Sequence, residues 1–544
     1  MTPCCISNLH LPKASALYLD YLYHYDRVGR FYSGTPHAPT SYRNVAQAIA
    51  GTHPHREALL EILTRQNRAF GCDQMTFANL DHLRDSRTFA VVTGQQVGLF
   101  SGPAFTIYKA LTAVMLARHL SQQGLPCVPV FWLATEDHDL EEVSSASILD
   151  DAGEMVTLRV SGERPAANSP VGNVKLSSEV DGALAHVEQL LPTGEPRDWL
   201  LQGLRESYAA GMRWGESFGR FMARLFSRFG VILLDPLDAQ VHELARPSIE
   251  YALEEAPRLR SLLQERSQNL VHSGYHAQVH VADDSTLLFA TRDGSRTVIR
   301  QRGEEFLVEG ANPSPLRQFE EWVARSPLDF TPSALLRPVV QDMLLPTVAY
   351  VAGPSELAYF GQSQVIYPEF GRPAPVIFPR AGFTLASHRE ERLLEKYHLT
   401  VEDVWQGEEY LRRKIAVVAD GDGTQAWSAR IDGGEAEMKR LFEGLGEEIG
   451  RLDPTLTEAL RHTQEKMSYQ LEKLRGKISR AAISRSELLS RHERELARFF
   501  MPSGNLQERE VSGIQFLGQT GSELLDRLLD RIRPDCADHQ FFVY

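Results

Sequence analysis

Several features that would assign this chain to a specialised class are missing from its 544 residues. No run of 18 or more apolar residues occurs, so no segment is typical of a membrane-spanning helix. The five cysteines include no CxxC pair and no zinc-finger spacing. A sparse and odd number of cysteines is typical of reduced thiols rather than of a disulfide framework.

Positive charge is also in short supply. The 57 Lys and Arg residues are outnumbered by 71 Asp and Glu, which gives a net charge of −14 and a pI near 5.7. Broad binding to nucleic acid needs a basic surface, so we expect no nucleic-acid partner. Residues 1–20 lack the charged and apolar regions of a secretory signal. We therefore expect a cytoplasmic protein without a membrane partner.

Five apolar stretches have the length of buried strands, at 88–96, 127–134, 231–236, 346–353 and 373–380. A glycine-punctuated turn and the helical pattern "GPAFTIYKALTAVMLARHL" separate the first two. Strand, turn, helix and strand form a βαβ unit, which predicts a parallel sheet in an α/β fold. The polar stretches 151–200 and 270–313 predict short inserted strands, such as "STLLFATRDGSRTVIR". A chain of this length predicts two or more lobes.

The C-terminal third has a different pattern. Between residues 435 and 500, apolar residues recur at three- and four-residue steps among many Glu, Lys and Arg, with a break at Asp453-Pro454. This pattern predicts an antiparallel coiled-coil arm. An ordinary helical bundle packed on the core remains the alternative, because the heptads are irregular. We expect a homodimer whose contact includes this arm, since its apolar stripe needs a partner beyond the hairpin.

The predicted organisation has three parts. The first is a core over 1–385, with insertions near 151–225 and 245–330. The second is a helical domain over 386–503 that carries the arm. The third is the segment 504–544, which returns to the core.

The stretch "FWLATEDHDLEEV" ends an apolar strand in four ionisable residues, Glu136, Asp137, His138 and Asp139. Ligands bind at the carboxyl ends of strands in open α/β sheets, so this run is a candidate catalytic site. Glu136 or Asp137 could pair with a substrate ammonium, and His138 could accept a proton. The alternative is a solvated helix start, where acidic residues are common. We expect no dedicated metal site, because adjacent residues seldom point at one ion.

The turn after the first strand, "TGQQVGLFSGPAFTIYKA", is rich in glycine and amide side chains. It matches neither GxGxxG nor the P-loop pattern. Glycines nevertheless let the backbone approach a ligand, and the amides of a helix start suit phosphate or carboxylate. The alternative is that these glycines only allow tight packing. The candidate binding residues here are Thr93, Gly94, Gln95, Gln96, Gly98, Gly102 and Lys109.

A second polar constellation lies in "RPVVQDMLLPTVAYVAGPSELAYFGQ". Ser355 is a plausible N-cap of the helix that follows the strand. In "FPRAGFT", Arg380 follows another strand and could hold carboxylates or a phosphate. The candidate binding residues are Arg337, Gln341, Gly353, Glu356, Tyr359 and Arg380. We predict that one pocket is lined by Thr93, Gln95, Gln96, Asp137, His138, Glu356 and Arg380.

Four motifs, in this order between residues 91 and 510, resemble the bacillithiol biosynthesis cysteine-adding enzyme family. They are "VVTGQQVGLFSGPAFTIYKALTAVMLA", "PVFWLATEDHDLEEV", "RPVVQDMLLPTVAYVAGPSELAYFGQ" and "PSGNLQERE". The resemblance implies a Rossmann-like core similar to class I nucleotidyltransferases, with connecting insertions and a coiled-coil domain that mediates dimerisation. It also implies an activity, the joining of L-cysteine to glucosaminyl-malate as the last step of bacillithiol synthesis.

Such a ligase must activate the cysteine carboxylate, and ATP with Mg²⁺ would supply this activation. No HIGH or KMSKS signature is present, so adenylation is an expectation from the resemblance alone. Two other functions stay open. One is a nucleotidyl-transferring or metal-assisted hydrolytic enzyme on the same core. The other is a non-enzymatic, nucleotide-binding coiled-coil scaffold, against which the polar clusters at three strand ends count.

Overall fold

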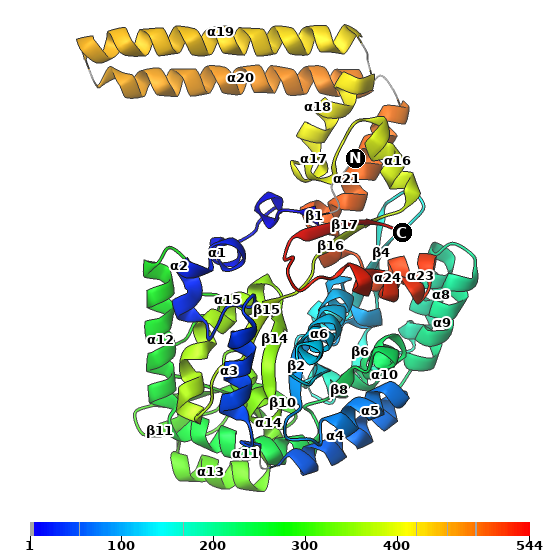
Figure 1. The fold of residues 1–544 in the computed structure, drawn as a ribbon, viewed down its shortest axis with the longest axis vertical. Coiled ribbons are helices and arrows are strands. Elements are labelled where there is room, and N and C mark those ends of the chain that lie inside the picture. Colours follow the sequence, from blue (N-terminus) through cyan, green and yellow to red (C-terminus); the bar gives the residue numbers. More distant parts are fainter. Residues whose placement is uncertain (1–4, 54, 167, 420–421, 454, 485–486) are drawn as a thin grey trace.

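The computed structural model describes all residues except 1–4, 54, 167, 420–421, 454 and 485–486. A five-stranded parallel sheet forms the centre of the molecule (Figure 1). In spatial order its strands are β15 (Val376–Pro379), β14 (Thr347–Ala352), β2 (Phe89–Gln96), β3 (Cys127–Ala134) and β8 (Ile232–Leu234). These are the five strands that the sequence predicts, so the parallel sheet is confirmed.

Each face of this sheet packs on its own hydrophobic core. In β3, Phe131 and Leu133 belong to one core, whereas Val130 and Trp132 belong to the other. This two-sided burial explains why the strand reads as a continuous apolar run. Burial of each such side chain contributes roughly 1.5–3 kcal/mol of transfer free energy.

Helices cover both faces. On the face of Phe131 lie α3 (Pro39–Ile49), α6 (Phe105–Gln122), α8 (Glu179–Leu190), α9 (Glu195–Ser207), α10 (Trp214–Phe226), α23 (Gly513–Thr520) and α24 (Glu523–Arg531). On the face of Trp132 lie α1 (Ala16–Tyr23), α2 (Tyr25–Val28), α4 (Arg56–Phe70), α5 (Gln74–His82), α11 (Ala239–Glu254), α12 (Ala256–His272), α13 (Leu316–Arg325), α14 (Arg337–Leu344) and α15 (Pro354–Ser363). The core is therefore a doubly wound α/β fold.

The inserted stretches differ from each other. The later one forms an antiparallel sheet, here called the inserted sheet, of β12 (Ser314–Pro315), β11 (Glu305–Leu307), β10 (Ser295–Arg302), β9 (Ser285–Arg292) and β13 (Phe330–Pro332). The earlier one contains the short strands β5 (Met155–Arg159), which pairs with β4 (Ser145–Leu149), β6 (Gly162–Glu163) and β7 (Lys175–Leu176). Its second half is helical, as α8 and α9, so the prediction of strands was wrong there. Val180, Ala183, Leu184 and Val187 bury one face at helical spacing, a signal that the polar composition obscured.

Beyond the core, the chain passes through β16 (Phe383–Ala386), α16 (His388–Lys396), α17 (Val401–Trp405) and α18 (Glu408–Ala419). The long helices α19 (Asp422–Leu452) and α20 (Leu456–Ser484) then lie side by side as a hairpin that stands away from the body (Figure 1). We call this hairpin the arm. It begins earlier than residue 435, and Pro454 at its predicted break lies outside the described residues.

The arm also ends earlier than predicted. Residues 487–500 are not part of the arm but form α21 (Glu487–Phe500). This helix buries Leu496 and Phe500 in a hydrophobic core of the body. The chain then returns to the body through α22 (Gln507–Glu510), α23, α24 and β17 (His539–Val543). Strand β17 lies between β1 (Cys5–Ile6) and β16 in a three-stranded sheet.

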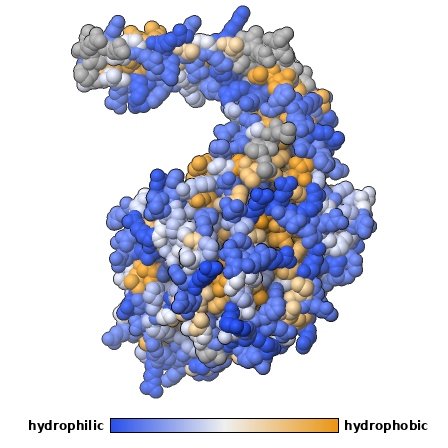
Figure 2. Space-filling model, in the orientation of Figure 1, coloured by the Kyte–Doolittle hydropathy of each residue, from blue (hydrophilic) through white to orange (hydrophobic). Residues whose placement is uncertain are grey.

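The surface of the arm is mostly hydrophilic, with scattered apolar patches, and an open hollow separates it from the body (Figure 2). Among the described helices, none is long and apolar enough to cross a membrane. Cys72, Cys127 and Cys536 are free thiols, and Cys4 lies outside the described residues.

Candidate functional site

A cavity of about 530 Å³ opens at the carboxyl ends of β2, β3, β14 and β15, and we call it the cleft. Parallel α/β sheets bind ligands at this edge. The cleft is lined by most of the residues that the sequence singles out. These are Gly94, Gln95, Gln96, Lys109, Glu136, Asp137, Arg337, Gly353, Glu356, Tyr359 and Arg380.

Some predicted residues lie elsewhere. Thr93 is fully buried, and its hydroxyl donates to the Val351 carbonyl at 3.0 Å. Gln341 is also buried and accepts a hydrogen bond from Arg337 at 3.0 Å. His138 lies beside the cleft without lining it. The single pocket predicted above therefore excludes Thr93, which lies inside β2 and bonds to the neighbouring strand, and His138, whose ring contacts Arg296.

Gly98 and Gly102 line an adjoining cavity rather than the cleft. The start of α6 is covered by the C-terminal segment, since Ala104 donates its amide to the Val511 carbonyl at 2.9 Å. A Cβ at Gly98 would lie 2.8 Å from the Gly102 Cα, and Gly102 has a φ of +67°. The structure thus favours the packing role for these two glycines, and the anion site at this helix start stays a prediction.

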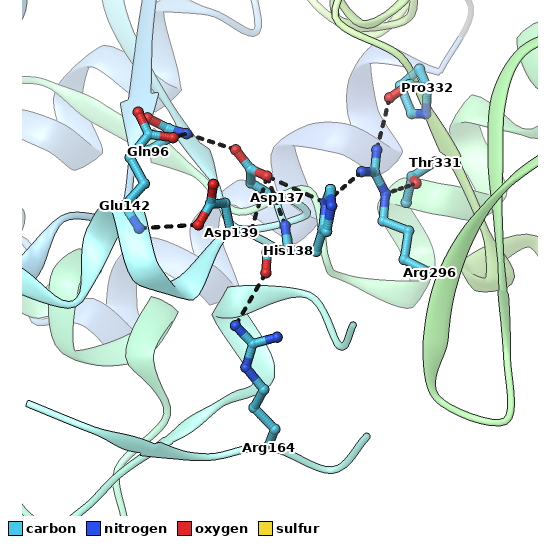
Figure 3. A network of polar contacts seen from close by, with 9 residues as sticks. All are labelled: Gln96, Asp137, His138, Asp139, Glu142, Arg164, Arg296, Thr331 and Pro332. Atoms are coloured by element: carbon cyan, nitrogen blue, oxygen red, sulfur yellow. Dashed lines mark hydrogen bonds and ion pairs between the residues drawn. The ribbon is translucent and has the colours of Figure 1, made fainter. Parts of the chain in front are cut away.

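The acidic run divides into separate roles (Figure 3). Asp139 is the N-cap of α7 (Leu140–Val143), where it accepts from the amide of Glu142 at 3.0 Å. Asp137 accepts from the amide of His138 at 2.7 Å and remains exposed to the cleft. The helix-start alternative therefore explains Asp139 but leaves Asp137 available to a ligand.

Glu136 lines the base of the cleft next to a buried histidine. Its Oε1 lies 3.1 Å from Nε2 of His242 on α11, and both side chains are buried. Burial lowers the pKa of His242, but the carboxylate of Glu136 outweighs this effect, so the net pKa is raised. Glu136 is therefore committed to an internal ion pair.

His138 is held by a residue from the inserted sheet. Nη1 of Arg296 lies 3.1 Å from Nδ1 of His138, and Arg296 also donates to the Thr331 hydroxyl at 2.8 Å (Figure 3). Nδ1 of His138 also lies 3.6 Å from Oδ1 of Asp137, so this nitrogen faces both a guanidinium and a carboxylate. The role of His138 as a proton acceptor stays a prediction. Arg296 lies in a polar β-hairpin, where no sequence motif indicates a functional site.

Gln96 joins two carboxylates at the other side of Asp137. Its Nε2 donates to Asp137 at 2.8 Å and to Glu142 at 2.7 Å (Figure 3). Glu142 also lines the cleft, although the sequence prediction omitted it from the run. Two adjacent carboxylates facing a cavity form a suitable environment for an ammonium group or for a proton leaving an amine.

A buried ion pair organises the floor of the cleft. Lys109 lies 2.5 Å from Glu356 and donates to the Gly94 carbonyl at 2.5 Å and to the Gln95 amide oxygen at 3.0 Å. Burial lowers the pKa of Lys109. All three ammonium protons have protein acceptors, so Lys109 positions its neighbours in the floor of the cleft.

Glu356 has further partners in β14 and at the start of α15. It accepts from the hydroxyl of Tyr350 at 2.8 Å and from the amide of Gly353 at 2.8 Å. Gly353, rather than Ser355, is the N-cap of α15. Tyr350 also lines the cleft, and a polar-tipped residue within an apolar strand was a signal that the sequence prediction did not use.

Guanidinium groups also line the cleft. Arg337 donates to the hydroxyl of Tyr359 at 2.9 Å. Arg380 forms a two-pronged ion pair with buried Glu508, at 2.6 and 3.0 Å. The pKa of Glu508 is lowered overall, because Arg380 outweighs the opposite effect of burial. The charge of Arg380 is thus already neutralised, whereas Arg509, which the sequence prediction omitted, reaches the cleft from α22.

Within the described ranges, no group of three or more His, Cys, Asp or Glu side chains is placed to hold a metal ion. The acidic run itself does not converge, since its members turn toward different partners. The cleft therefore combines carboxylates with guanidinium groups. Such a combination suits a small zwitterionic or amine-bearing ligand that also carries carboxylates.

Comparison with protein families matches the whole chain. Residues 5–381 match the model described as "Bacillithiol biosynthesis BshC, N-terminal Rossmann-like domain", and residues 383–543 match "Bacillithiol biosynthesis BshC, C-terminal coiled-coil domain". A protein of Solibacter usitatus is 37% identical over 99% of both chains, and one of Koribacter versatilis is 35% identical over 99% of both. A protein of Salinibacter ruber is 32% identical over 96% of this chain and 95% of its own. All three are named "Putative cysteine ligase BshC".

Proposed function

This chain belongs to the bacillithiol biosynthesis BshC family, and from that premise we propose that it is a ligase that joins L-cysteine to glucosaminyl-malate through an amide bond. The observation that carries the proposal is the presence of both charges in one cleft. Asp137 and Glu142 contribute carboxylates, and Arg337 and Arg509 contribute guanidinium groups. Cysteine is a zwitterion, and glucosaminyl-malate carries one amine and two carboxylates, so both substrates need groups of both charges.

The chemistry assigns a task to the two carboxylates, Asp137 and Glu142. The sugar amine is protonated in water, and it must lose a proton to attack the carbonyl carbon of cysteine. Asp137 and Glu142, held together by Gln96, would attract the ammonium and accept this proton. General bases of this kind contribute roughly 10²–10⁴-fold to turnover.

The guanidinium groups of Arg337 and Arg509 would act on the acyl group of cysteine. Negative charge develops on the cysteine carbonyl oxygen as the amine attacks, and donors that are already in place stabilise it. Arg337 is fixed for this purpose by Tyr359 and Gln341. Loss of the leaving oxygen and formation of the carbon–nitrogen bond complete the amide.

The cysteine carboxylate needs activation, for which the proposal includes ATP with Mg²⁺. The start of α15 fits a phosphate group better than the start of α6 does. Gly353, Pro354 and Ser355 line the cleft there, and Arg337 lines the same cleft, whereas the start of α6 is covered by Val511. ATP would supply a good leaving group at the cysteine carboxylate. Every other step rests on the side chains described above.

The test is a reconstituted assay with the purified full chain, L-cysteine and glucosaminyl-malate, with and without ATP–Mg²⁺. We expect a product whose mass equals that of the two substrates minus one water. Glu142→Gln should reduce kcat by about 10²–10⁴-fold, whereas the matched variant Glu141→Gln, on the same short helix, should not. Turnover of ATP without any need for cysteine would favour the nucleotidyl-transferring or hydrolytic alternative. No turnover of any kind would favour the scaffold.

A further inference from the structure

A second cavity, of about 280 Å³, adjoins the cleft, and we call it the side cavity. The two share four wall residues, namely Pro354, Ser355, Arg380 and Arg509. The other walls of the side cavity come from the N-terminal segment around Lys13, from the inserted region at His276, and from the C-terminal segment 504–509. A ligand that lies in the cleft can therefore extend into the side cavity past Arg509.

Most ionisable groups of the side cavity are already neutralised. Arg380 is paired with Glu508. Burial lowers the pKa of His539 to about 4, so that this ring is uncharged at neutral pH. His276 shares a hydrogen bond with Gln278 at 3.0 Å. The pair of Arg380 and Glu508 and the ring of His539 therefore offer no net charge to a ligand.

Lys13 and Arg509 differ from the groups above. Lys13 donates to the Asn505 side-chain oxygen at 2.8 Å and to the Gly504 carbonyl at 3.3 Å, and both of these acceptors are uncharged. The carboxylates that neighbour Arg509 in sequence are engaged elsewhere, Glu508 with Arg380 and Glu510 with Asn505 at 2.8 Å. Across the described part of the chain, neither Lys13 nor Arg509 forms an ion pair.

The contrast with the other cations of the cleft is clear. Lys109 and Arg380 have carboxylate partners, and Arg296 and Arg337 donate to two or more protein acceptors. Arg509 lines the cleft, the side cavity and the third cavity beside Gly98. Its guanidinium is therefore the cation at this junction that a ligand can take without breaking an ion pair.

We propose that the side cavity is the subsite for the two malate carboxylates of glucosaminyl-malate, with Lys13 and Arg509 as the contacts that recognise them. This inference rests on the proposed function. A dicarboxylate matches two uncompensated cations in number, and a guanidinium can bind one carboxylate through two parallel hydrogen bonds. Through the shared wall, the sugar amine then lies in the cleft on the side of Asp137 and Glu142.

The size of the side cavity agrees with this assignment. A volume of about 280 Å³ is smaller than the cavities that hold whole drug-sized ligands, and so it suits a fragment such as a four-carbon diacid. Inorganic phosphate has the same charge chemistry as the diacid. The experiment must therefore separate these two anions.

The first arm of the test measures steady-state kinetics of the full chain and of Lys13→Met and Arg509→Gln. Loss of one charge-assisted hydrogen bond should raise KM for glucosaminyl-malate by about tenfold or more, whereas KM for cysteine should stay within about twofold. The matched controls are Lys175→Met and Arg68→Gln, which remove exposed cations at positions distant in sequence from Lys13 and Arg509. A rise in both KM values, or in neither, would overturn the proposal.

The second arm does not depend on turnover. Isothermal titration with L-malate should show binding to the wild-type chain and about tenfold weaker binding to each variant. Inorganic phosphate should compete poorly. Binding of phosphate but not of malate would overturn the assignment, as would malate binding that both variants retain. If the wild-type chain makes no amide product but binds malate through Lys13 and Arg509, the proposed ligase fails while the carboxylate subsite stands.

Discussion

Arg296 Nη1 lies 3.1 Å from His138 Nδ1, and this contact joins the inserted sheet to the end of the central strand β3. The same guanidinium stacks over the ring of Phe289 at 3.7 Å and donates to Thr331. A residue far away in sequence therefore helps to fix the position of His138. We expect the main role of this histidine to be a contact that holds the inserted sheet beside the cleft.

Replacement of His138 by glutamine should therefore have a small effect. Glutamine keeps an acceptor for Arg296, so kcat of His138→Gln should fall by less than about tenfold, compared with the 10²–10⁴-fold that is typical of a lost general base. Steady-state kinetics, with the melting temperature measured on the same sample, check this. A loss as large as that of Glu142→Gln, without a drop in melting temperature, would restore His138 as the proton acceptor.

The pair of Lys109 and Glu356 should matter for stability more than for ligand contact. Lys109→Met leaves Glu356 largely buried without its cation, which should lower the free energy of unfolding by about 3 kcal/mol. The double variant Lys109→Met/Glu356→Gln should recover part of this loss, because no uncompensated charge remains. Urea unfolding of both single variants and the double variant gives the coupling energy. If the loss of stability in the double variant equals the sum of the losses in the two single variants, Lys109 and Glu356 do not stabilise each other.

Much of the fold follows from local sequence. Each strand of the central sheet is buried on both faces, so its apolar run is visible without knowledge of its neighbours. The polar residues at the carboxyl ends of β2 and β3 can also be located from sequence, because the carboxyl ends of parallel strands lie at the same edge of the sheet. Gln96 and Asp137 could thus be placed together from sequence.

The rest of the site depends on the tertiary fold. Arg296 comes from the inserted sheet and Arg509 from the C-terminal segment, and neither lies at the end of a central strand. Thr93 was misplaced because it lies inside β2 and its hydroxyl bonds to the neighbouring strand β14. Val511 covers the start of α6 from a distance of about four hundred residues, which no local pattern such as a glycine count can indicate.

The ion pair between Glu136 and His242 predicts a dependence of stability on pH. The pKa of His242 in the folded chain is raised above the value of roughly 6.5 in an unfolded chain. The stabilisation is therefore complete below pH 6.5 and is lost as the pH rises through the folded pKa. Glu136→Gln should remove this loss, so that its unfolding free energy falls less steeply with pH above about 6.5.

Chemical denaturation at a series of pH values from about 6 to 9 tests this prediction. The exposed variant Glu57→Gln serves as a control for a general change in net charge. Parallel curves for the wild-type chain and Glu136→Gln would contradict it. Asp235 lies in the same region, and its pKa is raised by burial and further by Glu136.

The arm leads to the last prediction, which concerns assembly. Helices α19 and α20 pack against each other, yet Leu441 on α19 is 59% exposed, and Met467 and Leu474 on α20 are 45% and 47% exposed. Met467 and Leu474 are seven residues apart and so share one face of α20. Apolar residues repeated on one face of a projecting helix are typical of a contact with another helix. We therefore propose that two copies of this chain associate through the arm.

Sedimentation velocity on the full chain should then report a dimer, and Met467→Lys/Leu474→Lys should give a monomer with an unchanged melting temperature of the body. The matched variant Lys466→Glu/Lys477→Glu alters two exposed charges on the same helix and should remain dimeric. Lysines at Met467 and Leu474 would place like charges at the contact and desolvate them, which is why the effect should be specific to that face. A dimer that survives both apolar substitutions would move the interface away from this face of the arm, and a monomeric wild-type chain would exclude association at the concentrations used.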